Sequence, residues 1–430
     1  MDVELNREEF INQYPPVNLM SPRLCDSVLQ RSPAHMYVHL PFCRHRCSYC
    51  YYKLFERHDR KFTTEYISHL KLEMDINARR PNVMNKIFRS LYIGGGTPTV
   101  VDADLLVELI DYAKQKFQFT PDAEICIEAK PDERDLSEEK LRSLKDVGVN
   151  RVSFGVETLN EDLLRANGRE ASTPGFFKMF ERARKVGFDI INLDFMSGIY
   201  GETDENWQNL TSELLRLRPD AVAFYKMEVY LNTKMFKELR RGASLGELMT
   251  NAKEIAMINY AFDRLEREGK YLPVNCFNLV ASPEKEHVHR RGIWSGEPML
   301  GMGLSSHSDF DGHLYQNAST VRDYYEPLLS GSLPIRRAYK LTARDEMSRF
   351  LVYGLKNLTV ERSRFLDRFG IDMMMPYGDE IRGLVEKGYV TLDDGALKVP
   401  REFVVFADDI CRAFFLPEYK KMMVAHLPRA

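Results

Sequence analysis

Residues 36–52, MYVHLPFCRHRCSYCYY, lead from a short apolar run into a loop that holds three of the chain's seven cysteines. The run at 36–40 has the length and composition of a buried β-strand. Cys43, Cys47 and Cys50 follow it with C-x₃-C-x₂-C spacing. This stretch therefore predicts a strand that ends in a thiol-rich loop, which is a candidate metal site.

Three kinds of chemistry could use such a loop. A structural zinc ion usually takes four protein ligands, and no second Cys or His pair with suitable spacing follows, although His45 or His58 could serve. Unconnected buried cysteines are common, but Arg44 and Arg46 make this loop basic, which stabilises thiolates. An iron–sulfur cluster of the [4Fe–4S] type accounts better for three thiols, because one iron then keeps an open position for a chelating small molecule.

Six apolar, β-rich runs alternate with amphipathic helical patterns along the first half of the chain. The runs span 36–40, 90–96, 124–129, 151–157, 189–198 and 221–229, and helices are predicted at 102–117, 137–148 and 174–187. Repeated βα units form a parallel sheet, whose strands we expect to be buried on both faces. The sheet could be open and doubly wound or an incomplete (β/α)6 barrel, and both architectures place ligands at the carboxyl ends of the strands.

The strict alternation ends near residue 235, which suggests four parts. We expect an N-terminal extension over 1–34, the β/α domain over 35–235, a connecting region over 236–335 and a C-terminal domain over 336–430. The connecting region includes an irregular, glycine-punctuated stretch at 292–312. The C-terminal domain is predicted to be mostly helical and winged-helix-like, with a short Asp-Gly hairpin. Acidic residues mixed through it argue against DNA binding.

Composition and charge narrow the class of protein. Apolar residues make up 44% and charged residues 29%, and the net charge is −3, so no basic field indicates nucleic acid or an anionic membrane. No apolar run approaches the length of a membrane-spanning helix, and the acidic, polar N-terminus does not resemble a signal peptide. The odd number of cysteines, four of them scattered singly, favours a reducing, cytoplasmic location.

Ligand-binding residue types recur where the later runs end. Gly94, Gly95, Gly96 and Thr97 follow the second run, and glycines there either form an ordinary turn or let a ligand approach the backbone closely. Arg169 follows the fourth run and could bind a carboxylate through two nitrogens.

Three carboxylates lie near the same ends of the third, fourth and fifth runs. Glu128, Glu157 and Asp194 are costly to bury without partners. They could form structural ion pairs with Lys130 and Arg151, or they could accept hydrogen bonds from ribose hydroxyls or an ammonium group.

The end of the sixth run carries further groups that can hold a proton. Tyr225, Lys226, Glu228 and Tyr230 stand there, although packing or solvation could also explain them. The candidate catalytic residues are Glu157, Tyr225, Lys226 and Glu228, in general acid–base roles.

These motifs, in this order, resemble those of a known family. The cysteine spacing and the GGGTP stretch at 94–98 resemble the radical S-adenosylmethionine (SAM) superfamily. Over about residues 35–370 the chain is similar to the oxygen-independent coproporphyrinogen III oxidase-like family. The segments that carry this similarity are YVHLPFC, CSYC, YIGGGTPT, IEAKPDE, GVNRVSFGVETLNEDLLRANGRE, INLDFMSGIYGET and MLGMGLSSHSDFDGHLYQN.

The resemblance implies an incomplete (β/α)6 barrel with a [4Fe–4S] cluster on Cys43, Cys47 and Cys50, and SAM on the open iron. One electron, from an external donor such as a flavodoxin or ferredoxin, would cleave SAM to methionine and a 5′-deoxyadenosyl radical that abstracts hydrogen from a small-molecule substrate. The cavity is implied to hold two SAM molecules. The residues implied to contact SAM are Tyr37, Tyr49, Gly94, Gly95, Gly96, Thr97, Glu128, Glu157, Arg169 and Asp194.

The resembling family contains porphyrinogen decarboxylases, haem chaperones, haem-opening enzymes, radical methyltransferases and cyclopropane-forming enzymes. Tyr52 stands where the decarboxylases commonly have a cysteine, and Glu157 stands where they tend to have Gln. Only His289 and Trp294 match the ends of the His-Asn-x-x-Tyr-Trp segment of the chaperones. The main expectation is therefore methyl or methylene transfer from a second SAM to an sp² carbon of a small biosynthetic substrate. Coproporphyrinogen III decarboxylation is the first alternative, and haem transport or degradation is the second.

Overall fold

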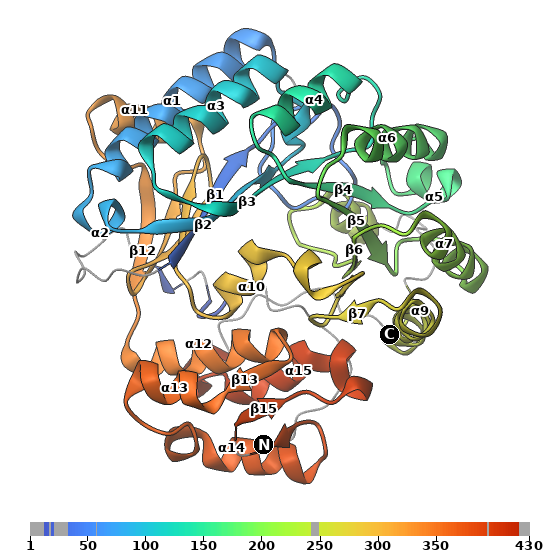
Figure 1. The fold of residues 1–430 in the computed structure, drawn as a ribbon, viewed down its shortest axis with the longest axis vertical. Helices are drawn as coiled ribbons and strands as arrows, with labels where there is room; N and C mark the ends of the chain where they lie inside the picture. Colours follow the sequence, from blue (N-terminus) through green and yellow to red (C-terminus); the bar gives the residue numbers. More distant parts are fainter. Residues whose placement is uncertain are drawn as a thin grey trace.

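The computed structural model describes residues 13–16, 19–20, 33–56, 58–241, 249–393 and 395–420. Six parallel strands pair in chain order at the centre of one curved sheet (Figure 1). They are β1 (Pro33–Leu40), β2 (Ile87–Gly95), β3 (Phe119–Ala129), β4 (Arg151–Glu157), β5 (Ile190–Ser197) and β6 (Ala221–Lys226). All six coincide with the predicted runs.

Helices connect these strands and cover the convex, outer face of the sheet (Figure 1). They are α1 (Arg60–Ala78), α2 (Pro81–Met84), α3 (Ala103–Lys116), α4 (Glu138–Asp146), α5 (Glu161–Ala166), α6 (Thr173–Val186) and α7 (Asp204–Leu217), followed after β6 by α8 (Lys234–Arg240) and α9 (Asn251–Gly269). Ser137 caps the start of α4, because its side chain accepts a hydrogen bond from Lys140 N. Gly187 ends α6 with φ 83°, a conformation that glycine adopts without strain.

Further strands extend both edges of the sheet. β9 (Met299–Met302) lies parallel to β1, and β10 (His307–Phe310), β11 (His313–Asn317) and β12 (Ile335–Lys340) continue antiparallel beyond it. β8 (Asn278–Val280) and β7 (Leu272–Pro273) add antiparallel strands beside β6. Because β1 pairs with β9 rather than β6, the sheet is an open half-barrel, as the incomplete (β/α)6 prediction required.

The prediction that 292–312 is irregular is wrong. Its residues contribute the end of a helix and the strands β9 and β10. The buried side chains of Leu300 and Met302 give β9 an apolar face that continues the sheet beyond β1. Glycines on both sides of this short run conceal it in the sequence.

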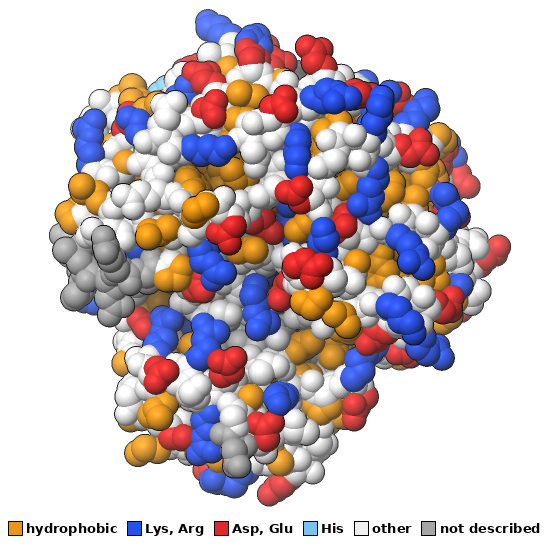
Figure 2. Space-filling view, in the orientation of Figure 1, with side chains coloured by type: hydrophobic (Ala, Val, Ile, Leu, Met, Phe, Trp, Pro, Cys, Tyr) orange, Lys and Arg blue, Asp and Glu red, His pale blue; other side chains and the backbone are white. Residues whose placement is uncertain are grey.

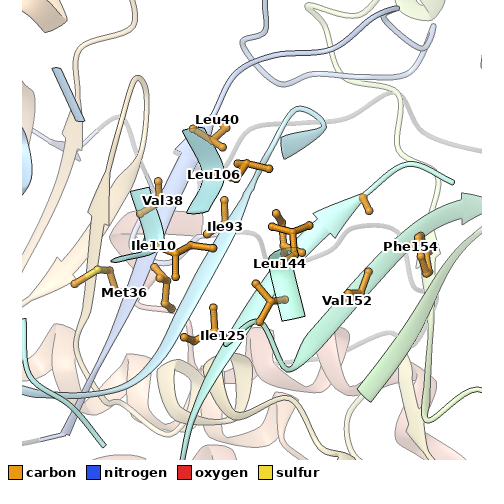
Figure 3. Packing of buried hydrophobic residues seen from close by; sticks show 14 of the residues in the cluster. Met36, Val38, Leu40, Ile93, Leu106, Ile110, Ile125, Leu144, Val152 and Phe154 are labelled. Carbon is orange, nitrogen blue, oxygen red and sulfur yellow. The ribbon is translucent and has the colours of Figure 1, made fainter. Parts of the chain in front are cut away.

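The two faces of the half-barrel differ in chemistry. Both are largely buried, as expected, but alternate side chains along each strand point to opposite faces. Those on the outer face are apolar and pack under α3 and α4, for example Val38, Ile93, Ile125 and Val152 (Figure 3). Burying each such side chain contributes roughly 1.5–3 kcal/mol. The inner face instead carries polar groups, and it is the face on which a ligand can bind.

Helix α10 (Val288–Trp294) lies on the inner side of the sheet, across β1 and β2 (Figure 1). After β11, α11 (Val321–Leu329) packs beside α1 and leads through β12 to a separate C-terminal unit, which lies below α10 in Figure 1. This unit contains α12 (Ala343–Lys356), β13 (Thr359–Glu361), α13 (Arg362–Phe369), α14 (Met374–Glu386), β14 (Thr391–Leu392), β15 (Ala396–Lys398), α15 (Ala407–Cys411) and α16 (Pro417–Lys420). The unit is mostly helical and carries the predicted hairpin, but the strand β13 between its first two helices was not predicted. These elements surround an apolar core of their own. The four domain boundaries themselves stay a prediction.

A groove of about 670 Å³ separates the half-barrel from the C-terminal unit. Basic side chains are visible along it in Figure 2, and acidic partners neutralise them there. Lys86 pairs with Asp311 at 3.0 Å, and Arg368 lies 3.5 Å from Glu346. None of the helices in the described part of the chain is long and apolar enough to span a membrane.

Candidate active site

The cysteine loop leaves β1 at the carboxyl edge of the sheet, where backbone hydrogen bonds fix it. Cys43 N donates to Phe55 O at 3.1 Å, and Cys50 N donates to Cys47 O at 3.2 Å. Cys43 is buried, Cys47 and Cys50 are half-buried, and none of the three is in a disulfide. Burial raises the pKa of Cys43 to about 11, so this thiol requires a bound cation to be a thiolate at neutral pH.

The glycine loop after β2 contacts the cysteine loop directly. Gly96 N donates to Leu40 O at 2.9 Å, and Thr97 N donates to Phe42 O at 2.7 Å. A Cβ atom on Gly96 would lie 2.4 Å from Phe42 O, so only glycine permits this approach. The Thr97 hydroxyl lies 3.4 Å from the Cys43 sulfur. The glycines therefore bring the second strand end against the thiols.

Glu128, at the end of β3, lies beside this glycine loop. Its carboxylate accepts hydrogen bonds from the Tyr92 hydroxyl at 2.5 Å and from Gly95 N at 3.0 Å. Burial raises the pKa of Glu128 to about 7, against the effect of both bonds. A Cβ atom on Gly94 would lie 2.9 Å from the Glu128 carboxyl group, so a larger residue at position 94 would crowd that group.

Arg169 connects the cysteine loop to the end of β4. Its Nη1 donates to the Cys47 sulfur at 3.4 Å, and its Nη2 lies 3.3 Å from Glu157 Oε1 and also donates to Gly155 O. Glu157 has a left-handed backbone, φ 67°, which is strained for Glu and turns its carboxylate toward Arg169. The Nε atom of Arg169 is buried with no hydrogen-bond partner in the described chain. That N–H is a donor that a ligand carboxylate could satisfy.

Asp194, on β5, is oriented by two neighbours rather than by an ion pair. Ser153 Oγ donates to its Oδ2 at 2.6 Å, and Asn192 Nδ2 donates to its Oδ1 at 2.8 Å. Burial raises the pKa of Asp194. The register of the sheet places Gly155 of β4 next to Asp194, so the acids of β4 and β5 share one region of the inner face.

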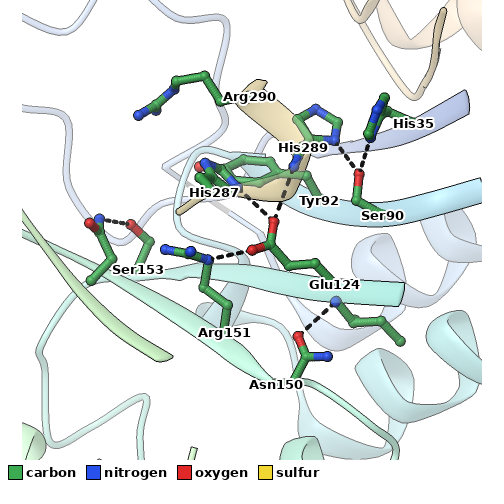
Figure 4. Close-up of polar contacts among 12 residues, drawn as sticks. His35, Ser90, Tyr92, Glu124, Asn150, Arg151, Ser153, His287, His289 and Arg290 are labelled. Atoms are coloured by element: carbon green, nitrogen blue, oxygen red, sulfur yellow. Dashed lines mark hydrogen bonds and ion pairs between the residues drawn. The ribbon is translucent and has the colours of Figure 1, made fainter. Parts of the chain in front are cut away.

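The alternative of structural ion pairs with Arg151 and Lys130 does not hold. Arg151 pairs instead with Glu124 at 2.7 Å, deeper in the half-barrel, where His287 and His289 also approach (Figure 4). Within the described residues, no ion pair joins Lys130 to a carboxylate. The three strand-end acids are thus left facing the inner space.

The region that holds these residues matches a known family. The model of the radical SAM superfamily matches residues 37–214, which include the three cysteines, the glycine loop, the three acids and Arg169. This part of the chain is therefore similar to the radical SAM superfamily.

Relatives match the protein over nearly its whole length. The heme chaperone HemW of Bacillus subtilis is 29% identical over 389 residues, which cover 88% of this chain and 98% of that protein. The oxygen-independent coproporphyrinogen III oxidase of Escherichia coli is 25% identical over 402 residues, covering 89% and 85%. The solved structure of coproporphyrinogen III oxidase (HemN) from Escherichia coli has a TM-score of 0.80 at 22% identity, covering 94% and 96%. The chain is thus similar over nearly its whole length to heme chaperones and coproporphyrinogen III oxidases, and this similarity implies a [4Fe–4S] cluster and SAM as cofactors.

The residues present fit this pair of cofactors. In the described part of the chain, no three His, Cys, Asp or Glu side chains are close enough together to ligate a single metal ion. A [4Fe–4S] cube binds each thiolate through a different iron and accommodates thiols that are further apart. Next to the thiols, the unpartnered Nε of Arg169 and the acceptor oxygens of Glu128 suit the carboxylate and ammonium groups of an amino acid such as the methionine part of SAM.

The predicted SAM-contacting tyrosines lie on two sides of this region. The Tyr37 hydroxyl hydrogen-bonds His39 Nδ1 at 2.9 Å, and its ring stacks on Tyr92 at 5.9 Å. Tyr49 lies between Cys47 and Glu157, and burial raises its pKa well above 10. His39 and Tyr92 were not predicted as site residues. Their positions on the inner-facing register of β1 and β2 are the sequence signal that identifies them.

The candidate catalytic residues Tyr225 and Lys226, at the end of β6, point to opposite faces of the sheet. Tyr225 points inward, where its hydroxyl accepts a hydrogen bond from Arg290 of α10 at 2.6 Å. Lys226 lies on the opposite face and donates to Asn251 at the start of α9 at 3.2 Å. Because neighbouring strand residues alternate, Lys226 cannot join Tyr225 in the interior, and its assignment as catalytic is not supported by this geometry.

Glu228 and Tyr52 belong to a cluster of tyrosines beside the cysteine loop. Glu228 accepts a hydrogen bond from Tyr230, whose ring lies 4.3 Å from that of Tyr51. Tyr51 in turn stacks on Tyr52 at 4.3 Å, directly after Cys50. Tyr52 is 44% exposed, so the cluster presents an open aromatic surface beside the cysteine loop.

Proposed function

We propose that this radical SAM protein abstracts a hydrogen atom from a carboxylate-bearing, tetrapyrrole-type substrate, in the manner of the oxygen-independent coproporphyrinogen III oxidases. The observation that carries the proposal is the similarity to those oxidases, which runs through the inner-face residues to the C-terminal unit. None of the full-length relatives quoted above is named for methyl or methylene transfer, so that expectation has no support and we do not propose it.

When bound, the cluster would supply the electron that cleaves SAM, and SAM would supply the hydrogen-abstracting radical. A propionate side chain that loses one hydrogen atom, CO₂ and one electron becomes a vinyl group, and the electron passes to an external acceptor. The protein's own residues bind and orient the reactants for this reaction. Arg169 is placed to hold an amino-acid carboxylate, while Glu128 and Asp194 are placed to accept hydrogen bonds from an ammonium group or hydroxyls.

A haem-carrier function is less well supported by the interior. His289, which resembles the chaperone segment in sequence, is only 5% exposed. Its Nδ1 is hydrogen-bonded to Ser90 Oγ at 2.8 Å, and its ring stacks on Tyr92 at 5.2 Å. A haem iron would have to displace this packing to reach the imidazole. We therefore propose catalysis rather than haem transport.

Anaerobic turnover with coproporphyrinogen III tests this function. Reconstituted protein, SAM and a reductant should release CO₂ and form a vinyl-bearing product together with 5′-deoxyadenosine. Methyl-labelled SAM should leave the product unlabelled. Protein that carries a full cluster and cleaves SAM, but returns coproporphyrinogen unchanged, would contradict the proposal. A stoichiometric shift of the haem absorption band without any turnover would favour the carrier function instead.

A further inference from the structure

Arg290 differs from the other arginines of the half-barrel interior in its partners. Its Nη2 donates to the Tyr225 hydroxyl at 2.6 Å, and its Nη1 donates to Asn278 Oδ1. Both partners are neutral. Across the described chain, no carboxylate lies within ion-pair distance of Arg290, whereas Arg151 pairs with Glu124 and Arg169 pairs with Glu157.

A guanidinium that is partly removed from water raises the free energy of the folded protein unless an anion pairs with it. The side chain is half-buried, and aromatic rings lie around it, with Phe277 at 4.9 Å and Trp294 at 5.8 Å from the guanidinium carbon. Isolated buried charges are rare because transfer from water costs several kcal/mol. The two described hydrogen bonds use only part of the guanidinium, which has further N–H donors. The Tyr225 hydroxyl, which accepts from Arg290, still has its own hydrogen to donate.

Arg290 lies inside the half-barrel, because α10 packs on the inner face of β1 and β2. In Figure 4 its guanidinium extends away from α10, apart from the His287–Glu124–Arg151 network. Tyr52, beside the cysteine loop, lies within electrostatic range of both Arg290 and Glu128. Arg290 and Asn278 also line a small cavity of about 20 Å³ together with Ser153 and Asn192 of the strands, so polar space adjoins the guanidinium.

We propose that Arg290, with Tyr225 and Asn278, forms a binding site for a carboxylate of the substrate, separate from the Arg169 site. This inference rests on the proposed function and deepens it, because it assigns the residues that anchor a carboxylate of the substrate. A guanidinium and a phenol hydroxyl directed at one point can hold both oxygens of a carboxylate. Arg290 is thus a binding residue for the substrate, and Asn278 positions it.

A small acid tests the site without knowledge of the full substrate. Propionate is titrated into the anaerobic, cluster-loaded enzyme labelled with ¹³C at the tyrosine Cζ, and the Tyr225 signal is assigned by its loss in Tyr225→Phe. Propionate should shift this signal, and uncharged propionamide should not. Arg290→Gln should weaken the response at least about tenfold, as expected for loss of a charged hydrogen bond. Arg290→Lys should recover part of it.

Two further variants separate binding from a merely structural role. Asn278→Asp places a carboxylate of the protein against Arg290 and should abolish the propionate response while the chain stays folded. Arg291→Gln is the matched control, because Arg291 is the neighbouring arginine, is exposed and pairs with Glu286 at 3.5 Å. A full propionate response in Asn278→Asp would overturn the inference.

SAM provides the competing carboxylate, so its binding is measured in the same variants. A fall in SAM affinity in Arg290→Gln equal to the fall in propionate affinity would overturn the substrate assignment. The outcomes also separate this inference from the proposed function. If propionate shifts the Tyr225 signal but coproporphyrinogen is not turned over, the proposed function is refuted and the Arg290 carboxylate site stands. Turnover without a propionate response would refute the site and leave the function.

Discussion

Replacing Arg169 with methionine tests whether the Arg169–Glu157 ion pair holds the cysteine loop against the end of β4. In the native protein the side chains of Arg169 and Glu157 are 10% and 16% exposed and lie 3.3 Å apart. The Arg169→Met variant leaves Glu157 without its cation, in a backbone conformation that already favours glycine. Removing one member of a buried pair costs about 3–5 kcal/mol, because the other charge stays buried. We therefore expect the metal-free chain to lose about 3–5 kcal/mol of unfolding free energy.

The loss of unfolding free energy in Arg169→Met should depend on pH in a defined direction. Burial already raises the pKa of Glu157, and Arg169 acts against this shift. Without Arg169 the folded state binds the Glu157 proton more tightly than the unfolded chain does. Stability of the variant should consequently fall as pH rises above the ordinary glutamate pKa of about 4.3. The defect should be smaller at about pH 5 than at about pH 8.

Urea unfolding of the wild type, Arg169→Met, Glu157→Gln and the double variant measures this effect. The double variant should be more stable than Arg169→Met, because it removes the stranded carboxylate. Equal unfolding midpoints for the wild type and Arg169→Met would refute the reasoning. So would a double variant no more stable than the single one at neutral pH.

Three other substitutions test separate parts of the site. Cys50→Ala should lose the bound iron, whereas Cys411→Ala, in the C-terminal unit, should keep it; iron analysis after reconstitution checks both. Gly96→Ala should destabilise the protein by about 1–3 kcal/mol and lower its iron content, because the new Cβ meets Phe42 O at 2.4 Å. Gly383→Ala in α14 has no neighbour within 4 Å and should be neutral or stabilising by up to about 1 kcal/mol, measured in the same urea series. Glu128 has a pKa raised to about 7, so wild-type stability should decline between about pH 4.5 and 7 more steeply than that of Glu128→Gln; parallel pH dependences would contradict the burial of this acid.

The sequence predicts the six-stranded half-barrel because each strand carries its own periodic signal. Residues such as Val38 and Leu40 alternate with Tyr37 and His39, so both the strand and its two faces can be read locally. The strand-end residues follow from the same rule, since the carboxyl ends of parallel strands meet at one edge. This is why the thiols, the glycine loop and the three acids were predicted as one site.

Other parts of the site depend on contacts that no local pattern encodes. Arg290 belongs to a segment whose composition resembles a surface loop, and its role arises because α10 folds against the inner face of β1 and β2. Lys226 stands at the predicted strand end, but its side chain lies on the face opposite Tyr225 and donates to Asn251 at the start of α9, a distant contact that no local pattern encodes. The edge strand β9 is short and flanked by glycines, so its pairing with β1 could not be inferred from periodicity.

Helix α10 contacts the C-terminal unit as well as the inner face of the sheet. The Asn357 side chain at the end of α12 donates to Arg291 O at 3.2 Å and to Ser295 Oγ at 3.3 Å. The Lys356 ammonium lies 4.7 Å from the centre of the Trp294 ring. The C-terminal unit thus supports the helix that carries the proposed carboxylate site. If that site binds substrate, substitutions in α12 should change substrate preference while the cysteine loop stays intact.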